Sequence, residues 1–368
     1  MAMVKINSYE EQLLRGDYGN EAKQLVEILL KIAEINGVNE FVEVSQTMIG
    51  KTCMLSVAGE TGINFLKRLA DSGVKFKVPT YTNVVSIDLE QWQDLSIAKD
   101  YVETQLKGVE AWKKLGAILN CSCIPFFSGA MPKYGDHAAY ADTATVIFAN
   151  SYFGVRSNRE SDLVCLASAI TGRVPKLGYH LDETRKGQYL IGVQATLNKE
   201  SDYGALGYYV GKLVKDKVPV FQSINKPNLS IHDFIHLGAS LATTGTVSLF
   251  HWDGITPEIR QNRAYYLDEA QIIDKIVITD QDLQNIYQQL NILKQPQVDL
   301  VYIGCPHCNI EKIKYIASLL KGKRINENLE LWISAPSSVK HLAAKNGDLQ
   351  EIERAGGRII SDTCAVIL

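Results

Sequence analysis

The chain has 368 residues, of which 46% are hydrophobic and 21% are charged, and its formal net charge is −3. This length allows two or three packing units with a large core, and the balanced charge gives no reason to expect nucleic acid or an anionic membrane as a partner. The N-terminus lacks an apolar core of signal-peptide length, and no stretch approaches the ~18 apolar residues of a membrane span. Seven cysteines argue against a disulfide scaffold. We therefore expect a cytoplasmic protein.

Helix-like and strand-like segments alternate along the chain. Ser8-x-x-Glu11 predicts a capping box that opens a short helix, and the apolar spacing over Asn20–Ile35 predicts a longer one. The alternation predicts an α/β protein with mostly parallel sheets flanked by helices, in several packed subdomains, with a break near 294–297. Further helices are expected at 62–70, 97–115, 282–293 and 310–320, and strands at 42–49, 74–78, 115–119, 145–148, 190–195, 218–221, 246–252, 300–303, 329–333 and 357–360.

Several cysteines lie directly after strand-like runs. Ligands collect outside the carboxyl ends of strands in open α/β sheets, so thiols in these positions are expected to converge. Thiolates suit a soft metal or an iron–sulfur cluster. A single cysteine is more often a small buried hydrophobe, and only the shared position of the set indicates a metal or cluster site. Three runs end in thiols in this way: Cys305 with Cys308, Cys364, and Cys121 with Cys123.

Two other interpretations of the thiols remain open. Cys305-Pro306-His307-Cys308 between a strand and a helix is a C-x-x-C motif, which thioredoxin-like thiol–disulfide oxidoreductases carry because a helix N-terminus stabilises the first thiolate. That fold also needs strands packed beside the motif, and only 60 residues follow Cys308. A structural zinc site formed by two cysteine pairs is the second alternative, although C-x-C is a less usual half-site than C-x-x-C. Its ligands would be Cys121, Cys123, Cys305 and Cys308.

The densest polar stretch runs from 149 to 160. Arg156 and Arg159, beside Asn150 and Asn158, are suited to hold a carboxylate or phosphate through paired N–H donors. The alternative is a solvated turn with surface arginines. The glycines of 204–211 fit neither a dinucleotide fingerprint nor a P-loop, which favours close packing of a helix on its neighbours. A lone histidine such as His251, before a turn, is more often structural than catalytic.

Several motifs occur in the order found in one known family. From about Ser8 to the C-terminus, the chain resembles the large subunit of aconitase X, a branch of the aconitase superfamily. The resemblance implies an aconitase-like α/β architecture over residues 1–368, an iron–sulfur cluster and a dehydratase reaction. The motifs include Cys123-Ile124-Pro125-Phe126, Gly135-Asp136-His137, Ala149-Asn150-Ser151, Gly154-Val155-Arg156-Ser157-Asn158-Arg159-Glu160, Phe250-His251-Trp252-Asp253-Gly254, Gly304-Cys305-Pro306-His307 and Asp362-Thr363-Cys364.

The resemblance also implies roles for single residues. Cys123, Cys305 and Cys364 are expected to bind three irons of a 4Fe-4S cluster, and Cys308 is the alternate ligand because its spacing from Cys305 suits a shared metal. The fourth iron would act as a Lewis acid on the substrate hydroxyl, and the base is implied to be a serine of a small subunit or domain. His251 and His307 are candidates to assist departure of hydroxide or to donate hydrogen bonds to the cluster. Substrate contacts are expected from Asn83, Asn150, Ser151, Arg156, Asn158 and Arg159.

Two activities are known in that family. A single-chain form, with a fused swivelling domain, dehydrates cis-3-hydroxy-L-proline, and a two-subunit archaeal form dehydrates mevalonate 5-phosphate to trans-anhydromevalonate 5-phosphate. The chain ends at Leu368, four residues after Cys364, and no small domain follows. This arrangement is similar to the two-subunit form. We therefore expect the large subunit of a heterodimeric hydro-lyase of the archaeal mevalonate pathway, with the hydroxyproline dehydratase and the thiol oxidoreductase as alternatives.

Overall fold

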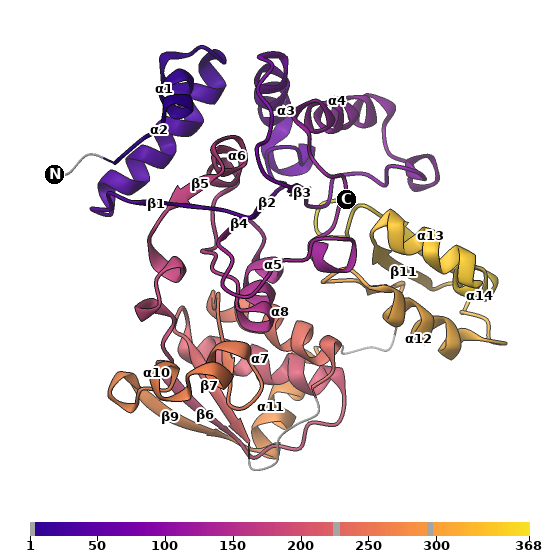
Figure 1. The fold of residues 1–368 in the computed structure, drawn as a ribbon. Coiled ribbons are helices and arrows are strands. Elements are labelled where there is room, and N and C mark those ends of the chain that lie inside the picture. The colour runs from indigo at the N-terminus through magenta and orange to yellow at the C-terminus, as the bar shows by residue number, and fades with distance from the viewer. Residues whose placement is uncertain (1–3, 224–228, 293–296) are drawn as a thin grey trace.

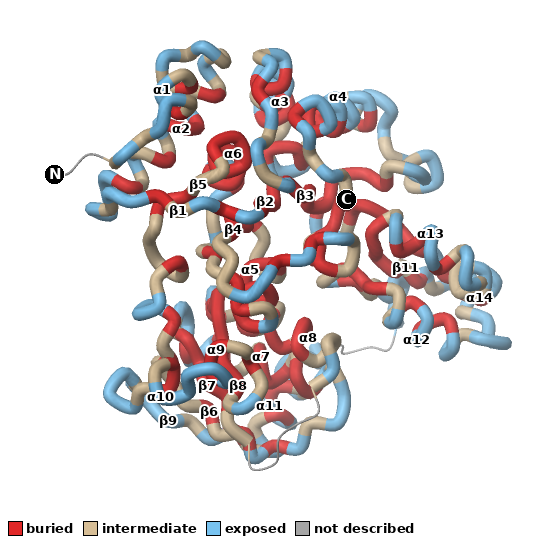
Figure 2. Tube along the Cα trace, in the orientation of Figure 1, coloured by how far each residue is buried: buried red, intermediate tan, exposed pale blue. Residues whose placement is uncertain are grey.

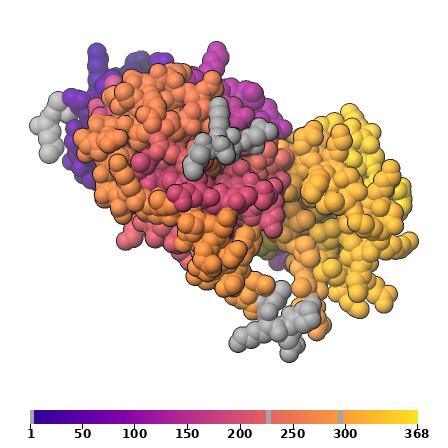
Figure 3. All heavy atoms as spheres, turned by 90° about the horizontal axis from the view of Figure 1, so that it is seen from below, coloured from indigo at the N-terminus to yellow at the C-terminus, as the bar shows by residue number. Residues whose placement is uncertain are grey.

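The computed structural model describes residues 4–223, 229–292 and 297–368. The chain forms three regions in sequence order: the first region (4–186), the second region (187–292) and the third region (297–368). Figure 1 shows the first region above the second, with the third beside them and the C-terminus returning to the first region. The view from below shows the second region in front and the third at its side (Figure 3). The predicted break near 294–297 falls largely on 293–296, which lie outside the described residues.

The first region combines a parallel and an antiparallel sheet. β2 (Gln46–Ile49) lies between β3 (Thr80–Thr82) and β4 (Ala138–Tyr140) in parallel pairings, whereas β1 (Phe41–Glu43) pairs antiparallel with β5 (Arg173–Pro175). The α-helices of this region are α1 (Ser8–Arg15), α2 (Gly19–Ile35), α3 (Leu55–Asp71), α4 (Lys99–Leu115), α5 (Thr143–Phe148) and α6 (Asp162–Thr171). Short 3₁₀ helices are η1 (Trp92–Leu95), η2 (Pro125–Phe127), η4 (Gly178–His180) and η5 (Glu183–Arg185), and η3 (Ala149–Phe153) is a π-helix.

The second and third regions each contain one fully parallel sheet, in the strand orders β8-β7-β6-β9 and β10-β11-β12. The prediction of an α/β protein with mostly parallel sheets is therefore confirmed. The elements are β6 (Tyr189–Val193), α7 (Glu200–Val214), β7 (Pro219–Ser223), α8 (Ile231–Gly245), β8 (His251–Trp252), α9 (Pro257–Gln261), α10 (Arg263–Tyr266), η6 (Glu269–Gln271), β9 (Asp274–Ile278) and α11 (Asp280–Leu290), followed by β10 (Leu300–Ile303), α12 (Ile310–Leu320), β11 (Glu330–Ala335), α13 (Ser337–Asn346), α14 (Asp348–Ala355) and β12 (Gly357–Ser361).

One hydrophobic core is shared by the first and second regions, a further one lies within the first region, and another lies within the third. The buried segments in Figure 2 lie along the strands and the inner helix faces. α7 and α8 pack closely because glycines leave room for the backbones. A Cβ on Gly207 would lie 2.5 Å from the Leu237 carbonyl oxygen, and one on Gly245 would lie 2.2 Å from the Gly211 carbonyl oxygen. The prediction that the glycines of 204–211 serve helix packing is confirmed.

The strand predicted at 145–148 is wrong, because these residues lie in helix α5. The β-branched run Thr145-Val146-Ile147 favours a strand locally. The Asp142 side chain instead accepts hydrogen bonds from the amides of Ala144 and Thr145, which caps the helix N-terminus, and burial of the apolar face stabilises the helix.

Three further predictions in the first region need correction. The predicted strand 42–49 is divided into β1 and β2. Residues 74–78 form no strand, because the amide of Phe76 donates to the end of α4 and that of Lys77 donates to α6, and the strand comes later at β3. The run 115–119 makes only an isolated bridge between Ile118 and Tyr81.

The capping box of α1 lies one residue earlier than predicted. Asn7 and Glu10 exchange the two capping hydrogen bonds, instead of Ser8 and Glu11. Glu10 is fully buried and forms an ion pair with Arg173, 2.7 Å away, and this tertiary contact sets the position of the helix start.

Candidate functional site

The carboxyl ends of strands from the first and third regions meet at one place. β3 and β4 end beside Asn83 and Asp142, while β10 and β12 lead into the loops that carry Cys305 and Cys364. The amide of Val85 donates to the carbonyl oxygen of Asp362 at 2.8 Å and joins the two edges. The C-terminus beside β3 in Figure 1 marks this position. It is the edge of a parallel sheet at which ligands collect.

Three of the predicted thiols gather here. Burial raises the pKa of the Cys123 thiol, and the neighbouring Asp142, Cys305 and Cys364 raise it further, whereas the amide of His307 lowers it. Burial, Cys364 and Asp142 likewise raise the pKa of Cys305. Cys305 is exposed, and Cys123 and Cys364 are half-buried, so the group opens toward solvent. We call Cys123, Cys305, Cys364, Asp142 and His307 the thiol site.

A glycine lets the Cys305 loop leave the sheet. Gly304 has a φ of +141°, and a Cβ at this position would lie 2.6 Å from the Ser334 Cβ of β11. The Cys308 amide donates to the Ser334 carbonyl oxygen at 2.8 Å. The loop is thus held tightly against the central strand of its sheet, which fixes the direction in which Cys305 leaves it.

His307 joins all three cysteine loops. Its amide N–H donates to Cys123 Sγ at 3.3 Å, and its ring Nε2–H donates to the carbonyl oxygen of Thr363 at 2.9 Å. Burial lowers the pKa of the His307 ring to about 4, so the ring is neutral. The ring Nδ1 and the Thr363 hydroxyl are buried and find no hydrogen-bond partner among the described residues.

Asp142 is the member of this site that the sequence analysis missed. Its Oδ2 accepts a hydrogen bond from Asn83 Nδ2 at 3.0 Å, and Thr145, in the helix that it caps, donates to the Cys123 carbonyl oxygen at 2.6 Å. Burial raises the pKa of the Asp142 carboxyl. The sequence carries a helix N-cap signal at Asp142, but the prediction of a strand at 145–148 left no helix for Asp142 to cap. Asn83, a predicted substrate contact, lies beside the thiols through this bond.

Most of the polar stretch 149–160 serves the fold. The Asn150 amide is fully buried, donates to the carbonyl oxygens of Ser157 and Ser248 at 2.8 Å and accepts from the Ser157 amide. Ser151 Oγ accepts from the Phe250 amide at 2.9 Å. Asn158 donates to Glu160 and to the carbonyl oxygen of Leu177, and it accepts from the amide of Tyr179. These three predicted substrate contacts are therefore occupied by bonds within the chain.

The two predicted arginines differ. Arg156 forms an ion pair with Asp182 and donates to the carbonyl oxygen of His180, so its guanidinium is engaged. Arg159 is exposed and forms no ion pair or side-chain hydrogen bond with the described residues. Its backbone bridges Tyr140 in parallel, which extends the carboxyl edge of β4 by one more segment. Arg159 therefore remains available at the edge that carries the thiol site.

His251 lies apart from the thiols. Its Nε2–H donates to the carbonyl oxygen of Arg185 at 2.7 Å, and burial lowers the pKa of its ring. Arg185 and Glu258 form an ion pair with both side chains at most 1% exposed. The contacts of His251 are thus with this buried pair and with the ring of Tyr266, 5.4 Å away.

Cys308 and Cys121 are placed differently from the three gathered thiols. Cys308 is 5% exposed and belongs to the apolar core of the third region, where burial raises its pKa to about 12. Cys121 is buried beside Thr82, and burial also raises its pKa. The pairings needed for a C-x-x-C disulfide or a four-thiol zinc site are not favoured by this arrangement, since within each proposed pair one thiol is in a core.

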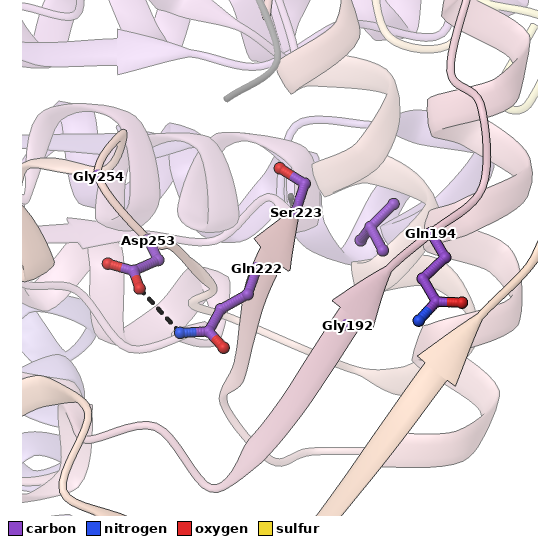
Figure 4. A pocket seen from close by; sticks show the side chains of 7 residues that line it. Gly192, Gln194, Gln222, Ser223, Asp253 and Gly254 are labelled. Carbon is purple, nitrogen blue, oxygen red and sulfur yellow. Dashed lines mark hydrogen bonds between the residues drawn. The ribbon is translucent and has the colours of Figure 1, made fainter. Parts of the chain in front are cut away.

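A separate cavity of about 540 Å³ lies at the carboxyl ends of β6, β7 and β8 in the second region. Its lining includes Gln194, Gln222 and Asp253, and Gln222 donates to Asp253 at 2.8 Å (Figure 4). None of its lining residues belongs to the thiol site.

Within the described ranges, no helix is long and apolar enough to span a membrane. The same ranges contain no group of three or more His, Cys, Asp or Glu side chains arranged around a single metal ion.

Three domain families match the chain: aconitase X first domain over residues 3–183, second domain over 187–288 and third domain over 298–368. A phosphomevalonate dehydratase large subunit from Methanocaldococcus jannaschii is 36% identical over 363 residues, which are 97% of this chain and 88% of the relative. A cis-3-hydroxy-L-proline dehydratase from Pseudomonas aeruginosa is 28% identical, over 99% of this chain and 62% of the relative.

A solved structure is similar over the same length. The crystal structure of the holo-form of Thermococcus kodakaraensis aconitase X superposes with a TM-score of 0.87 at 32% identity, covering 99% of this chain and 89% of that one. The sequence matches span all three regions and include the loops of the thiol site. The chain belongs to the aconitase X family.

Proposed function

We propose that the chain is the large subunit of an iron–sulfur hydro-lyase that dehydrates mevalonate 5-phosphate to trans-anhydromevalonate 5-phosphate. The observation that carries this proposal is the gathering of Cys123, Cys305 and Cys364 from three loops that His307 links, two of which follow β10 and β12. The relatives with 33–36% identity that are named as phosphomevalonate dehydratase large subunits favour this substrate over hydroxyproline.

The donors of the thiol site fit a 4Fe-4S cluster. Three thiols of the kind that bind iron come from separate loops, and Cys305 is open to solvent. Cluster ligands bind different irons, so they need not crowd around one point as ligands of a single ion do. The Thr363 hydroxyl and the His307 Nδ1, both buried and without a hydrogen-bond partner in the described ranges, are polar atoms at the same place that await a partner. When bound, such a cluster supplies a Lewis acid for the substrate hydroxyl.

Groups of the chain itself affect whether the thiols are protonated. The amide N–H of His307 donates to Cys123 Sγ and favours the thiolate over the thiol. Because burial raises the pKa of all three thiols, cluster assembly has to displace their protons and is favoured at higher pH.

Asp142 is our candidate for the acid of the reaction. Its raised pKa lets it keep a proton at a higher pH than an exposed aspartate, and Asn83 orients its carboxyl group. Dehydration removes a proton from the carbon next to the carboxylate and hydroxide from the next carbon, and a carbon–carbon double bond forms between them. We assign delivery of a proton to the departing hydroxide to Asp142, and removal of the carbon-bound proton to a serine of the small subunit.

The remaining site residues divide into substrate contacts and residues that position the loops or hold the fold. We propose Asn83 and Arg159 as substrate contacts, because both lie at the carboxyl edge that carries Asp142. His307 positions the cysteine loops, and His251 acts on the site only through the fold of the second region. A small subunit completes the heterodimer, a proposal supported by the relatives that are named large subunits.

The test is anaerobic purification and reconstitution with iron and sulfide, followed by iron and acid-labile sulfide analysis and electron paramagnetic resonance. We expect three or four irons per chain, and dehydration of mevalonate 5-phosphate once a small subunit is added. Turnover of cis-3-hydroxy-L-proline instead would change the substrate and keep the reaction class. Absence of bound iron after reconstitution would remove the hydro-lyase proposal.

A further inference from the structure

Lys51 lies in a turn that is fixed at both of its neighbours. The turn follows β2, and the buried carboxylate of Asp162 accepts hydrogen bonds from the amide of Gly50 at 2.6 Å and from the amide of Thr52 at 2.7 Å. The Thr52 hydroxyl donates to the same carboxylate. A Cβ on Gly50 would lie 2.5 Å from the Asn83 Cβ, so only glycine lets β2 and β3 end this closely.

The turn places Lys51 at the same edge as the thiol site. β2 is the central strand between β3 and β4, so Lys51 follows the middle strand while Asn83 and Asp142 follow its two neighbours. The charge of Lys51 acts on the Asp142 carboxyl and counters the increase in its pKa that burial causes. Lys51 is exposed and makes no ion pair or side-chain hydrogen bond with any described residue.

Three other cations, Arg156, Lys312 and Arg159, differ from Lys51. Arg156 is engaged by Asp182, and Lys312 by Glu200. Arg159 lies on the segment beyond β4, on the side away from β2 and β3. Lys51 therefore follows the central strand, whose two neighbours lead to Asn83 and Asp142, and it has no side-chain partner among the described residues.

We propose that Lys51 binds the carboxylate of the substrate. This inference rests on the proposed function and adds a residue that determines specificity. An anionic substrate is stabilised by a cation at its site, and the clamped turn holds Lys51 at the strand end without reorganisation. An ammonium on the carboxylate also stabilises the negative charge that develops as the adjacent carbon loses its proton.

The carboxylate is a better partner for Lys51 than the phosphate. In mevalonate 5-phosphate the carboxylate is one carbon away from the carbon that carries the leaving hydroxyl, and the phosphate is on the far side of it. Lys51 follows the strand next to the one that leads to Asp142, the residue assigned to the departing hydroxide, so a carboxylate near the leaving hydroxyl is the nearer anion. Arg159, further along the edge, is then free to meet the phosphate.

The test compares Lys51→Met and Lys51→Arg in the reconstituted two-subunit enzyme, with Lys113→Met on the exposed face of α4 as the matched control. We expect Lys51→Met to raise KM for mevalonate 5-phosphate by about 10- to 100-fold, the loss typical of a charge-assisted hydrogen bond. Iron content and melting temperature stay unchanged. Lys51→Arg restores most of the affinity, and Lys113→Met has no effect.

Calorimetric titration of the cluster-free complex separates this inference from the proposed function. With mevalonate 5-phosphate and with mevalonate, we expect the same proportional loss of affinity in Lys51→Met. A loss confined to the phosphorylated compound would assign Lys51 to the phosphate and overturn the proposal. Turnover with KM and binding unchanged in Lys51→Met would also overturn it and leave the dehydratase intact. If Lys51→Met weakens binding while the unaltered enzyme shows no turnover, Lys51 remains a ligand contact and the proposed dehydration is rejected.

Discussion

The thiol site and the buried ion pair of Arg185 with Glu258, which joins the first and second regions, are both clusters of polar side chains, but they differ in how many of their groups are already bonded. Around Arg185, the guanidinium is bound by Glu258 at 2.6 and 2.9 Å and by the carbonyl oxygen of Tyr179 at 3.0 Å. In the thiol site, Cys305 is exposed, and the His307 Nδ1 and the Thr363 hydroxyl have no partner in the described ranges, whereas around Arg185 the buried atom without such a partner is His251 Nδ1. We call the first cluster the Arg185 junction; its members are Asn150, Tyr179, Arg185, His251 and Glu258.

The difference separates structural from chemical roles. A buried polar group that is fully bonded to the chain stabilises one conformation and has no free donor or acceptor for a ligand. A group that is held in place but lacks a partner can accept one. Arginines, asparagines and histidines therefore carry little information about function until their bonds are known.

The largest expected effect is loss of the cluster. Cys305→Ser removes a thiolate that no other described group replaces, so we expect bound iron and the visible absorbance to be lost after reconstitution. Cys308→Ala, three residues on but in the apolar core, is the control and should keep its iron. Iron retained in Cys305→Ser and lost in Cys308→Ala would exchange the two ligand assignments.

Breaking the Arg185 junction should affect the fold and leave the chemistry. Glu258→Gln leaves the buried Arg185 charge uncompensated, and we expect the free energy of unfolding to fall by about 3–5 kcal/mol in urea titrations. The exposed pair of Glu110 with Lys113 provides the control, since Glu110→Gln should cost less than about 1 kcal/mol. A fall in iron per folded chain in Glu258→Gln would show that the two clusters are coupled.

Two polar residues of the stretch 149–160 should differ in the quantity that their substitution changes, which is KM for Arg159 and the free energy of unfolding for Asn150. Arg159→Ala should raise KM for mevalonate 5-phosphate about tenfold with iron unchanged, because a charged contact is worth roughly this much. Asn150→Ala should lower the free energy of unfolding by about 1–3 kcal/mol, since its buried backbone partners lose their bonds. An unchanged KM in Arg159→Ala would make the arginine a surface residue.

A pH dependence is expected at the edge of the Arg185 junction. Burial, His137, Arg185 and Arg156 lower the pKa of His180 to about 3, against about 6.5 in the unfolded chain. As pH falls from 6.5 toward 3, the unfolded chain takes up a proton before the folded one does. This contribution to stability is therefore complete above pH 6.5 and is lost by about 1.4 kcal/mol per pH unit below it.

Comparison with a residue that does not titrate isolates this contribution. Between pH 6.5 and pH 5, the free energy of unfolding of the unaltered chain should fall by about 2 kcal/mol more than that of His180→Gln. Urea titrations at the two pH values measure both. Equal slopes for the two proteins would mean that His180 takes up its proton as readily in the folded chain as in the unfolded chain.

Local patterns in the sequence were sufficient for the class of fold and for the position of the thiols. Apolar spacing predicted α2, α4 and α12, and the runs before Cys305 and Cys364 are the strands β10 and β12. These features depend on side-chain periodicity and chain reversal over a few residues, which neighbouring residues largely determine. The cysteines at the ends of these strands were therefore visible as candidates before any contact was known.

The tertiary structure decided which of the candidate groups are available. Cys305 and Cys308 belong to one motif, yet one faces the thiol site and the other lies in a core. Asn150 and Arg159 belong to one polar stretch, yet Asn150 is fully bonded and Arg159 is not. Asp142 became visible only with helix α5. Availability depends on partners that lie far away in the chain, such as Ser248 for Asn150, and no local pattern records which distant groups will occupy a side chain.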